Sequence, residues 1–597
     1  MATAEMKKTA IVVGAGVGGI ATAARLAKAG FSVTVLEKNN FTGGRCSLIH
    51  HDGYRFDQGP SLLLLPKMFK ETFHDLDTSL EDEGVKLLKC EPNYNLWFGD
   101  GEKFELSTDA SVMKREIEKW EGKDGFERYL QWLGEAHRHY ELSVREVLHK
   151  NFTSIFNMLR PSFLLNVFAL HPFESIYSRA SKYFWTERLR RVFTFGSMYM
   201  GMSPFDAPGT YSLLQYTELA EGIWYPIGGF HAVVGALVRI CERLGVDIQL
   251  NSPVDSVLTS NDGKTTTGVL LSSGKKLNAD LVVINADLVY AYNNLFPSSK
   301  STSYARSLQK RAGSCSSISF YWALSTQVPQ LNTHNIFLAD EYRESFDSIF
   351  DRQSIPDEPS FYVNVPSRID PTAAPKGKDS IVVLVPVGHL LNSATPQGDS
   401  SVTSGAGIPK EQDWELIVKS TRQRILQIIE SRTKCGSLEP LIIHEELNTP
   451  TSWESRFNLD KGSILGLSHS FFNVLAFRPK TKHPEIKGVY FVGASTHPGT
   501  GVPIVLGGAK ITSTQILEDL EIPWKVKENM IQDEGVTQEK GTSNLDRIVK
   551  ERPILSNVGI FILALVVLIL TMGYVNSNLV VLWDADMKRG WGSGKAI

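Results

Sequence analysis

The most constraining feature of this sequence is a glycine-rich turn near its N-terminus. Apolar residues at 10–13 run into GAGVGG (14–19), which is followed by a helical stretch at 20–30 and a second apolar strand at 32–36 that ends at Glu37. A GxGxxG turn inside a complete βαβ unit is typical of a dinucleotide-binding sheet. The sequence therefore predicts an α/β protein that binds a dinucleotide through this segment.

The residues of this turn have separate roles in such a site. Gly14 allows the tight turn, Gly16 lets the backbone approach a pyrophosphate, and Gly19 lets the helix pack closely on the strand. The helix N-terminus then faces the phosphates, and Glu37 can accept a hydrogen bond from the adenosine ribose. An acid at this position disfavours NADP, whose extra phosphate it would repel, but the βαβ unit alone serves both NAD and FAD.

Further glycine turns favour FAD and leave NAD as the weaker alternative. TGGR (42–45) can wrap the pyrophosphate and flavin side of FAD, and its arginine supplies charge. FDQGPS (56–61) adds another turn, and near the other end the strand 489–492 meets a glycine-rich turn and a helix. The predicted cofactor-binding residues are Gly14, Gly16, Gly19, Glu37, Gly43, Gly44, Arg45, Gly59, Pro60, Ser61, Val254, Gly493, Gly501 and Val502.

Composition and spacing argue against several other classes of protein. Lys and Arg number 62 against 65 Asp and Glu, so the charge balance gives no case for nucleic-acid binding. The five cysteines form no CxxC pair and the histidines show no metal-ligand spacing, so we expect a reduced, intracellular protein without a metal site. No Gly-x-Ser-x-Gly elbow or HExxH motif supports a hydrolase.

The C-terminal region predicts a membrane span. Residues 554–574 carry no charge and, at about 1.5 Å per residue, would cross a hydrocarbon core of about 30 Å as a helix. A buried core helix is the alternative, but such a helix seldom lacks a polar face entirely. The charged stretch 525–553 is then a linker, 575–597 is a short tail, and the catalytic part is expected on the cytosolic side, at the endoplasmic reticulum.

Several segments resemble the carotenoid phytoene desaturases of the bacterial and fungal type. They are VVGAGVGGIATAARLAKAG, LEKNNFTGGR, FDQGPS, WYPIGGF (224–230), NADLVYAYNNL (285–295) and VGASTHPGTGVPIVLGGAK (492–510). The C-terminal span is similar to that of the fungal members. Flavin amine oxidases usually carry Gly-Asp in the late motif, and Gly493-Ala494-Ser495 departs from that pattern here, which fits the desaturase subgroup.

The resemblance implies a discontinuous Rossmann-like FAD-binding domain with an inserted α+β substrate lobe and a C-terminal transmembrane helix. The FAD-binding domain would comprise residues 8–88, 223–300 and 481–524, and the lobe residues 89–222 and 301–480. It also implies conversion of 15-cis-phytoene from the bilayer to lycopene, with 3,4-didehydrolycopene after one further step. FAD would accept hydride, and oxygen or a quinone would reoxidise it.

The alternatives are a flavin-dependent saturase, oxidase or isomerase on another isoprenoid lipid, or a non-catalytic lipid escort of similar fold. A homo-oligomer is compatible with the sequence. The apolar stretch 152–170 is either ordinary core or a face through which a lipid enters from the membrane. Within it, Arg160 is a candidate catalytic residue or a snorkelling surface arginine. His497, in the late turn, is a second catalytic candidate or the partner of a backbone carbonyl.

Overall fold

The computed structural model describes residues 7–296, 303–391 and 412–524. The chain divides into a large compact unit, Met1–Thr153 with Leu170–Glu528, and a small one, Ser154–Ala169 with Asn529–Ile597. The predicted linker, transmembrane segment and tail (525–597) lie outside the described residues. Within the described ranges, every helix is too short or too polar to cross a bilayer.

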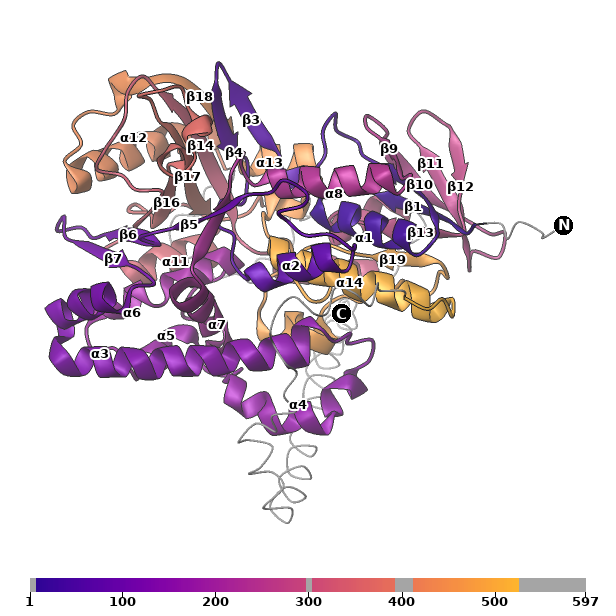
Figure 1. Ribbon diagram of the computed structural model, residues 1–597, viewed down its shortest axis with the longest axis horizontal. Coiled ribbons are helices and arrows are strands. Elements are labelled where there is room, and N and C mark those ends of the chain that lie inside the picture. Colours follow the sequence, from indigo (N-terminus) through magenta and orange to yellow (C-terminus); the bar gives the residue numbers. More distant parts are fainter. Residues whose placement is uncertain (1–6, 297–302, 392–411, 525–597) are drawn as a thin grey trace, which may run out of the picture. The chain divides into compact units, whose positions relative to one another are not determined.

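A five-stranded parallel sheet carries the N-terminal glycine turn (Figure 1). In spatial order its strands are β19 (Val489–Phe491), β13 (Leu281–Ile284), β1 (Thr9–Val13), β2 (Ser32–Leu36) and β9 (Asp247–Gln249). Helix α1 (Val17–Lys28) connects β1 to β2 and packs against α8 (His231–Arg243) and α14 (Val502–Asp519). This confirms the βαβ unit and shows that distant parts of the chain complete one sheet.

Three strands precede β13 in the chain. β10 (Val254–Thr259), β11 (Thr266–Leu271) and β12 (Lys276–Asn278) form an antiparallel meander that leads into β13. β11 and β12 form a hairpin in which Val269 pairs with Leu277. Apolar side chains of the meander pack on the parallel sheet, so both belong to the same part of the molecule.

A second, seven-stranded sheet forms the core of the rest of the large unit. Its order is β18 (Ile442–Asn448), β14 (Ser316–Leu324), β17 (Ser380–Val387), β16 (Phe361–Asn364), β15 (His334–Phe337), β6 (Tyr94–Trp97) and β7 (Lys103–Leu106). Only β15 and β6 pair in parallel. Alternate side chains face opposite sides, so Leu96 and Ile336 pack towards α3 while Phe337 and Phe361 pack towards α12 (Trp414–Thr433).

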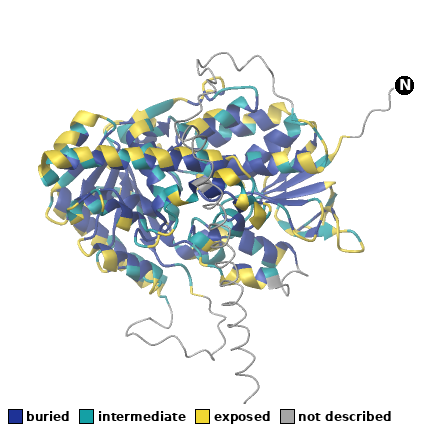
Figure 2. Cartoon of the chain, turned by 90° about the horizontal axis from the view of Figure 1, so that it is seen from below, coloured by how far each residue is buried: buried dark blue, intermediate teal, exposed yellow. Residues whose placement is uncertain are grey.

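The long helix α3 (Ala110–Ser143) is followed by a π-helical turn at Val144–Leu148. Asp109 caps it by accepting from the Ser111 and Val112 amides, and Gly122 interrupts it with φ 69°. Its buried residues include Met113, Tyr129 and Trp132, which pack in one apolar core with the second sheet. Figure 2 shows buried residues in the interior and exposed ones on the outer faces of the helices.

Two antiparallel pairs complete the strands: β3 (Leu48–His51) with β4 (Tyr54–Asp57), and β5 (Leu87–Cys90) with β8 (Ile223–Pro226). The remaining α-helices of the large unit are α2 (Pro66–His74), α5 (Ile176–Ala180), α6 (Glu187–Val192), α7 (Leu213–Tyr216), α9 (Leu288–Tyr290), α10 (Ser303–Lys310), α11 (Tyr342–Phe350) and α13 (Pro450–Phe457). The small unit contains α4 (Pro161–Asn166).

Candidate active site

The GxGxxG turn lies at the carboxyl end of the parallel sheet, closed over the side chain of Asn285. Gly14 has φ 97°, a conformation that favours glycine. A Cβ on Gly19 would lie 2.1 Å from the Gly14 carbonyl oxygen, and one on Gly16 would lie 2.8 Å from the Asn285 amide. Oriented to satisfy both of its groups, that amide accepts from the Gly19 N–H at 3.2 Å and donates to the Val492 carbonyl at 3.3 Å. The glycines thus allow close packing as well as access to a phosphate.

Glu37 is buried directly beside this turn. Its Oε2 accepts from the Ala15 N–H at 2.8 Å, and its Oε1 accepts from the Asn39 N–H at 2.9 Å. The Glu37 carbonyl accepts from the Ser252 N–H at 2.7 Å, which brings the start of β10 and the half-buried Val254 to the same edge of the sheet. The predicted ribose-binding acid and Val254 therefore lie in one neighbourhood.

The TGGR loop lies against the first turn. The Gly43 N–H donates to the Ala15 carbonyl at 2.8 Å, and both Gly43 and Gly44 have positive φ. A Cβ on Gly59 would lie 2.5 Å from the Arg45 carbonyl oxygen, so the FDQGPS turn packs on the same loop. Burial lowers the pKa of the Arg45 guanidinium, and no described residue gives it a hydrogen bond or ion pair.

The late glycine turn brings a second helix N-terminus to this place. The side chain of Asn285 lies next to Gly493, and α14 begins at Val502 after Gly501, which has φ 97°. Like α1, α14 has neither a side-chain cap nor an acid in its first turn. By contrast, α3 and α12 are capped by aspartates. The uncapped N–H groups and dipoles of α1 and α14 favour an anion.

These features fit the pyrophosphate and flavin of FAD. Two uncapped helix N-termini offer backbone donors, and the glycine turns leave room for close approach. Arg45 offers a half-buried positive charge that forms no hydrogen bond or ion pair among the described residues, although the Asp287 carboxylate acts on it electrostatically. The structure places the GxGxxG turn, Glu37, the TGGR loop and Gly59 in one neighbourhood, and Ser61 directs its Oγ to the Tyr362 hydroxyl at 2.7 Å. That the predicted residues bind the cofactor stays a prediction.

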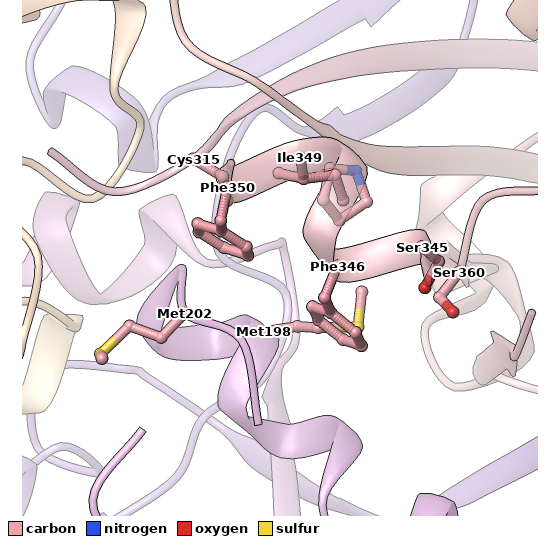
Figure 3. A pocket seen from close by; sticks show the side chains of 9 residues that line it. Met198, Met202, Cys315, Ser345, Phe346, Ile349, Phe350 and Ser360 are labelled. Atoms are coloured by element: carbon pink, nitrogen blue, oxygen red, sulfur yellow. The ribbon is translucent and has the colours of Figure 1, made fainter. Parts of the chain in front are cut away.

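An apolar pocket lies in the part of the large unit built on the seven-stranded sheet. Figure 3 shows Met198 and Met202 on one segment and Phe346, Ile349 and Phe350 on α11. The pocket is small, with a cavity volume of about 10 Å³, which is room for about one water molecule. It is an apolar point of this lobe and does not enclose a long molecule in this structure.

The pocket is linked to the late glycine turn by a short series of contacts. The Ser495 Oγ accepts from the Leu467 N–H at 3.2 Å, and the Gly466 carbonyl accepts from the Ser314 N–H at 2.9 Å. Ser314 precedes Cys315, which lines the pocket. A few contacting residues therefore connect the apolar pocket to the late FAD-binding turn in space.

Comparison with known proteins identifies the family. Residues 17–517 match the flavin-containing amine oxidoreductases. A phytoene desaturase from Cercospora nicotianae is 61% identical over 584 residues, covering 90% of this chain and 94% of the relative. One from Neurospora crassa is 60% identical over 541 residues, covering 88% of each. The chain belongs to the phytoene desaturases of the flavin-containing amine oxidoreductase family.

The solved structures support the same fold. A putrescine oxidase with putrescine bound has a TM-score of 0.55 at 15% identity, covering 86% of this chain and 99% of that chain. As a phytoene desaturase family member, the chain is an oxidoreductase acting on CH–CH groups, and its cofactor is FAD. The predicted family, enzyme class and cofactor are confirmed.

The two catalytic candidates occupy different places. His497 is buried, and its Nε2 lies 2.8 Å from the Lys150 carbonyl oxygen, which is the structural alternative stated for it. Arg160 lies in the small unit, where it precedes α4. A catalytic role for either residue stays a prediction.

Sequence reasoning missed Asn285 and Asp287. Both follow β13, and the carboxyl ends of parallel strands are where ligands of such sheets bind, so their positions were the available signal. Asp287 caps α9 and accepts from the Ser495 Oγ at 3.3 Å, and burial raises its pKa to about 6. Asp287 lies two residues after Asn285, whose side chain contacts the glycine turn.

One side-chain group elsewhere has metal-ligand geometry. Potential ligand atoms of Glu135, His139 and His171 lie within 4.8 Å of one another. However, the Glu135 carboxylate is paired with the Arg179 guanidinium and also accepts from the Tyr183 hydroxyl at 2.7 Å. Because the arginine already neutralises the only acid of the group, we assign no metal to it.

Proposed function

We propose that this protein is a membrane-associated, multi-step carotenoid desaturase that converts 15-cis-phytoene to lycopene and on to 3,4-didehydrolycopene. The observation that carries the proposal is the pair of uncapped helix N-termini at the glycine turns, in a chain that is 61% identical to a phytoene desaturase over 584 residues. A hydrocarbon offers no hydrogen-bonding groups, so it needs an apolar, water-excluding site beside the oxidant.

FAD, when bound, supplies a hydride acceptor, which no protein side chain can provide. The chain's own residues bind and orient it. The Gly14–Gly19 turn and the α1 and α14 N-termini hold the pyrophosphate, Glu37 binds the ribose, and Arg45 neutralises negative charge. The apolar pocket then positions the substrate chain and excludes water, so that consecutive carbons are placed for dehydrogenation.

Membrane association is supported by the small unit. Phe156 is 74% exposed and Phe168 54% exposed, and Ile155 and Leu159 are also exposed. Several exposed apolar side chains within sixteen residues favour contact with an apolar surface. We propose that this face admits the carotenoid from the bilayer and that residues 554–574 anchor the chain, with the catalytic part in the cytosol at the endoplasmic reticulum.

We further propose that oxygen or a quinone reoxidises the flavin. The proposed function is tested by recording the visible spectrum of the purified full-length protein and incubating it with 15-cis-phytoene in liposomes under air. A flavin band and new carotenoid absorption support it, and the product wavelengths count the double bonds. A flavin band without carotenoid products would mean that the substrate is another lipid. A protein that binds no FAD would favour a lipid escort.

A further inference from the structure

A fully buried acid without a cationic partner lies in the part of the chain that contains the pocket. Glu218 is 1% exposed, in the π-helical turn Thr217–Glu221 that follows α7. Its Oε2 accepts from the Gln215 Nε2 at 2.9 Å, and its Oε1 accepts from the Tyr94 hydroxyl at 3.4 Å. Among the described residues, no lysine, arginine or histidine forms an ion pair with it. Burying a carboxyl in this way is costly unless it is protonated.

The groups that surround Glu218 are neutral. Tyr94 on β6 also accepts a hydrogen bond from the Tyr199 hydroxyl, in the 3-10 turn Phe195–Met200. His334 on β15 lies next to Tyr94, with ring centroids 5.9 Å apart. Burial lowers the pKa of His334 to about 3, so this imidazole is uncharged. The titratable side chains that contact Glu218 or Tyr94 are therefore phenols and a neutral imidazole, and the nearest other acid in the sequence, Glu221, is bonded to Tyr140.

A hydrogen-bonded series continues from this histidine towards the FAD-binding turns. The His334 Nδ1 lies 2.7 Å from the Tyr362 hydroxyl, and that hydroxyl lies 2.7 Å from the Ser61 Oγ. Ser61 belongs to the FDQGPS turn, whose Gly59 packs against the Arg45 carbonyl. Polar side chains thus extend from the surroundings of Glu218 to the cofactor site.

The same group contains buried polar atoms that have no partner among the described residues: Gln215 Oε1, His334 Nε2, Asn93 Oδ1 and Asn364 Oδ1. The Gln215, Asn93 and Asn364 side chains are bonded to Glu218 or to His334 through their amide nitrogens, and the Nδ1 of His334 lies 2.7 Å from the Tyr362 hydroxyl. Buried polar atoms of this kind normally bind internal water, and a site that leaves them unpaired is unfavourable without a function.

This polar group also borders the apolar pocket. Tyr199, which bonds to Tyr94, follows Met198, which lines the pocket. The 3-10 turn Phe195–Met200 therefore contributes Met198 to the apolar pocket and Tyr199 to the polar group. A substrate held in the pocket would lie beside an internal path for protons.

We propose that Glu218, with Tyr94 and the polar atoms around it, forms an internal proton-accepting site for the desaturation reaction. The proposal rests on the proposed function. In each step, two C–H bonds on neighbouring carbons break and a C=C bond forms. One hydrogen leaves as hydride to FAD, the oxidant of the reaction. The other leaves as a proton, passes through the Tyr94 hydroxyl or internal water to the Glu218 carboxylate, and is later released to solvent.

The electrostatics fit this role. Burial raises the pKa of Glu218 to about 8, which is close to the working pH of an enzyme and suits proton transfer. The accepting form is the carboxylate, so the rate that depends on Glu218 should rise as the pH rises towards about 8. His334, with a pKa of about 3, does not compete for the proton.

The test compares Glu218→Gln with Glu221→Gln in the full-length, FAD-loaded protein. Glu221 lies three residues away, bonds to Tyr140 at 3.1 Å, and makes no contact with the Glu218 group among the described residues. The first readout is the infrared C=O band of a protonated carboxyl during a pH titration, which needs no substrate. The second is the pH profile of kcat for phytoene in liposomes.

We expect a wild-type carboxyl band that titrates near pH 8, persists in Glu221→Gln and disappears in Glu218→Gln. Glu218→Gln should retain FAD but lower kcat by about 10²-fold and lose the rising limb of the pH profile. Tyr199→Phe, which keeps the acid, should lower kcat less and keep the limb. If Glu218→Gln fails to fold, Tyr199→Phe still tests the proposal through its kcat and its pH profile.

The proposal is overturned if Glu218 is already ionised at pH 6, or if Glu218→Gln keeps the wild-type kcat and pH limb. It is also overturned if Tyr199→Phe loses the pH limb while the carboxyl band still titrates. If wild-type protein does not desaturate phytoene while the carboxyl band titrates as expected, the proposed function has failed and the buried proton site remains.

Discussion

The parallel sheet and the seven-stranded sheet place polar groups in opposite ways. Around the parallel sheet, the groups that face the cofactor are mostly backbone N–H groups from glycine turns and two helix N-termini. Around the seven-stranded sheet, the polar groups are side chains, such as Tyr94, His334 and Glu218, from segments far apart in the sequence. A site built from backbone N–H groups has no room for an added methyl group. The chemistry of a site built from side chains depends instead on which of those side chains are ionised.

The two regions also stabilise their acids differently. Next to the glycine turn, Asp75 is paired with Arg25 and Lys510, and Glu71 with Lys510 and His149. In the other region Glu218 has hydrogen bonds but no cation. Hydrogen bonds from His149 and Lys510 outweigh burial and lower the pKa of Glu71 to about 2, whereas burial raises the pKa of Glu218 to about 8.

The largest effect is expected from Gly19→Ala in the backbone site. The added methyl group would lie 2.1 Å from the Gly14 carbonyl oxygen, so α1 must move away from the turn. We expect FAD affinity to fall by at least about 10²-fold, about 3 kcal/mol, measured by flavin retention and fluorescence titration. Gly134→Ala on the exposed face of α3, where an added Cβ meets nothing, is the matched control and should keep FAD. Normal FAD binding by Gly19→Ala would contradict the packing described.

Arg45→Ala should have the next largest effect. Arg45 forms no hydrogen bond or ion pair among the described residues and only a longer-range attraction to the Asp287 carboxylate, so its loss removes mainly a charged hydrogen bond to the cofactor. A charged hydrogen bond of about 1.5–3 kcal/mol corresponds to about 10–10²-fold weaker FAD binding. Arg45→Lys should recover part of the affinity. If alanine binds FAD as tightly as arginine, the guanidinium does not face the cofactor.

Met198→Trp tests the pocket of the other region. The larger ring would overfill the small apolar pocket next to Phe346, whose cavity volume is about 10 Å³. Overpacking costs about 1–3 kcal/mol, so stability should fall moderately while FAD stays bound. We expect products with fewer double bonds, read from carotenoid absorption spectra. Met200→Trp, on the same turn but outside the pocket lining, should alter the product pattern less; equal patterns in both variants would remove the pocket from the substrate path.

The two regions should also differ in how the free energy of unfolding depends on pH, and at alkaline pH the change should come from Glu218. Burial raises the pKa of Glu218 from its ordinary 4.5 to about 8, so its contribution to the stability of the fold is fully present below about pH 4.5 and is lost as the pH rises through about 8. Thermal unfolding between pH 5 and 9 should therefore show a smaller decline in Glu218→Gln than in the wild type. An unchanged decline would mean that Glu218 is not the responsible group.

On the acid side, a smaller effect should come from the ion pairs near the glycine turn. Burial alone would raise the pKa of Glu71, but hydrogen bonds from His149 and Lys510 lower it to about 2. Its stabilisation is present above about pH 4.5 and lost as the pH falls through about 2. Lys510→Met should weaken this acid-side loss without altering the alkaline side. A variant that changed the alkaline side instead would break the contrast between the two regions.

The cofactor-binding segments could be predicted from the sequence because the residues that form each turn are close together in the chain. The turn at 14–19, Glu37 and the TGGR loop are consecutive, and glycine spacing carries the backbone geometry that a pyrophosphate requires. The late turn was also visible as a strand, a glycine-rich turn and a helix, and the resemblance to phytoene desaturases added the expected two-part organisation. The C-terminal span at 554–574 and the tail stay predictions, because they lie outside the described residues.

Only the tertiary structure revealed Asn285 within the glycine turns, the His497 contact with Lys150, and the group around Glu218. The sequence by itself determined the βαβ unit, the FAD site and the family, since backbone conformation follows from local glycine spacing. The tertiary structure decided which acids are buried or paired, because burial and ion pairing depend on residues that are distant in the chain and adjacent only after folding.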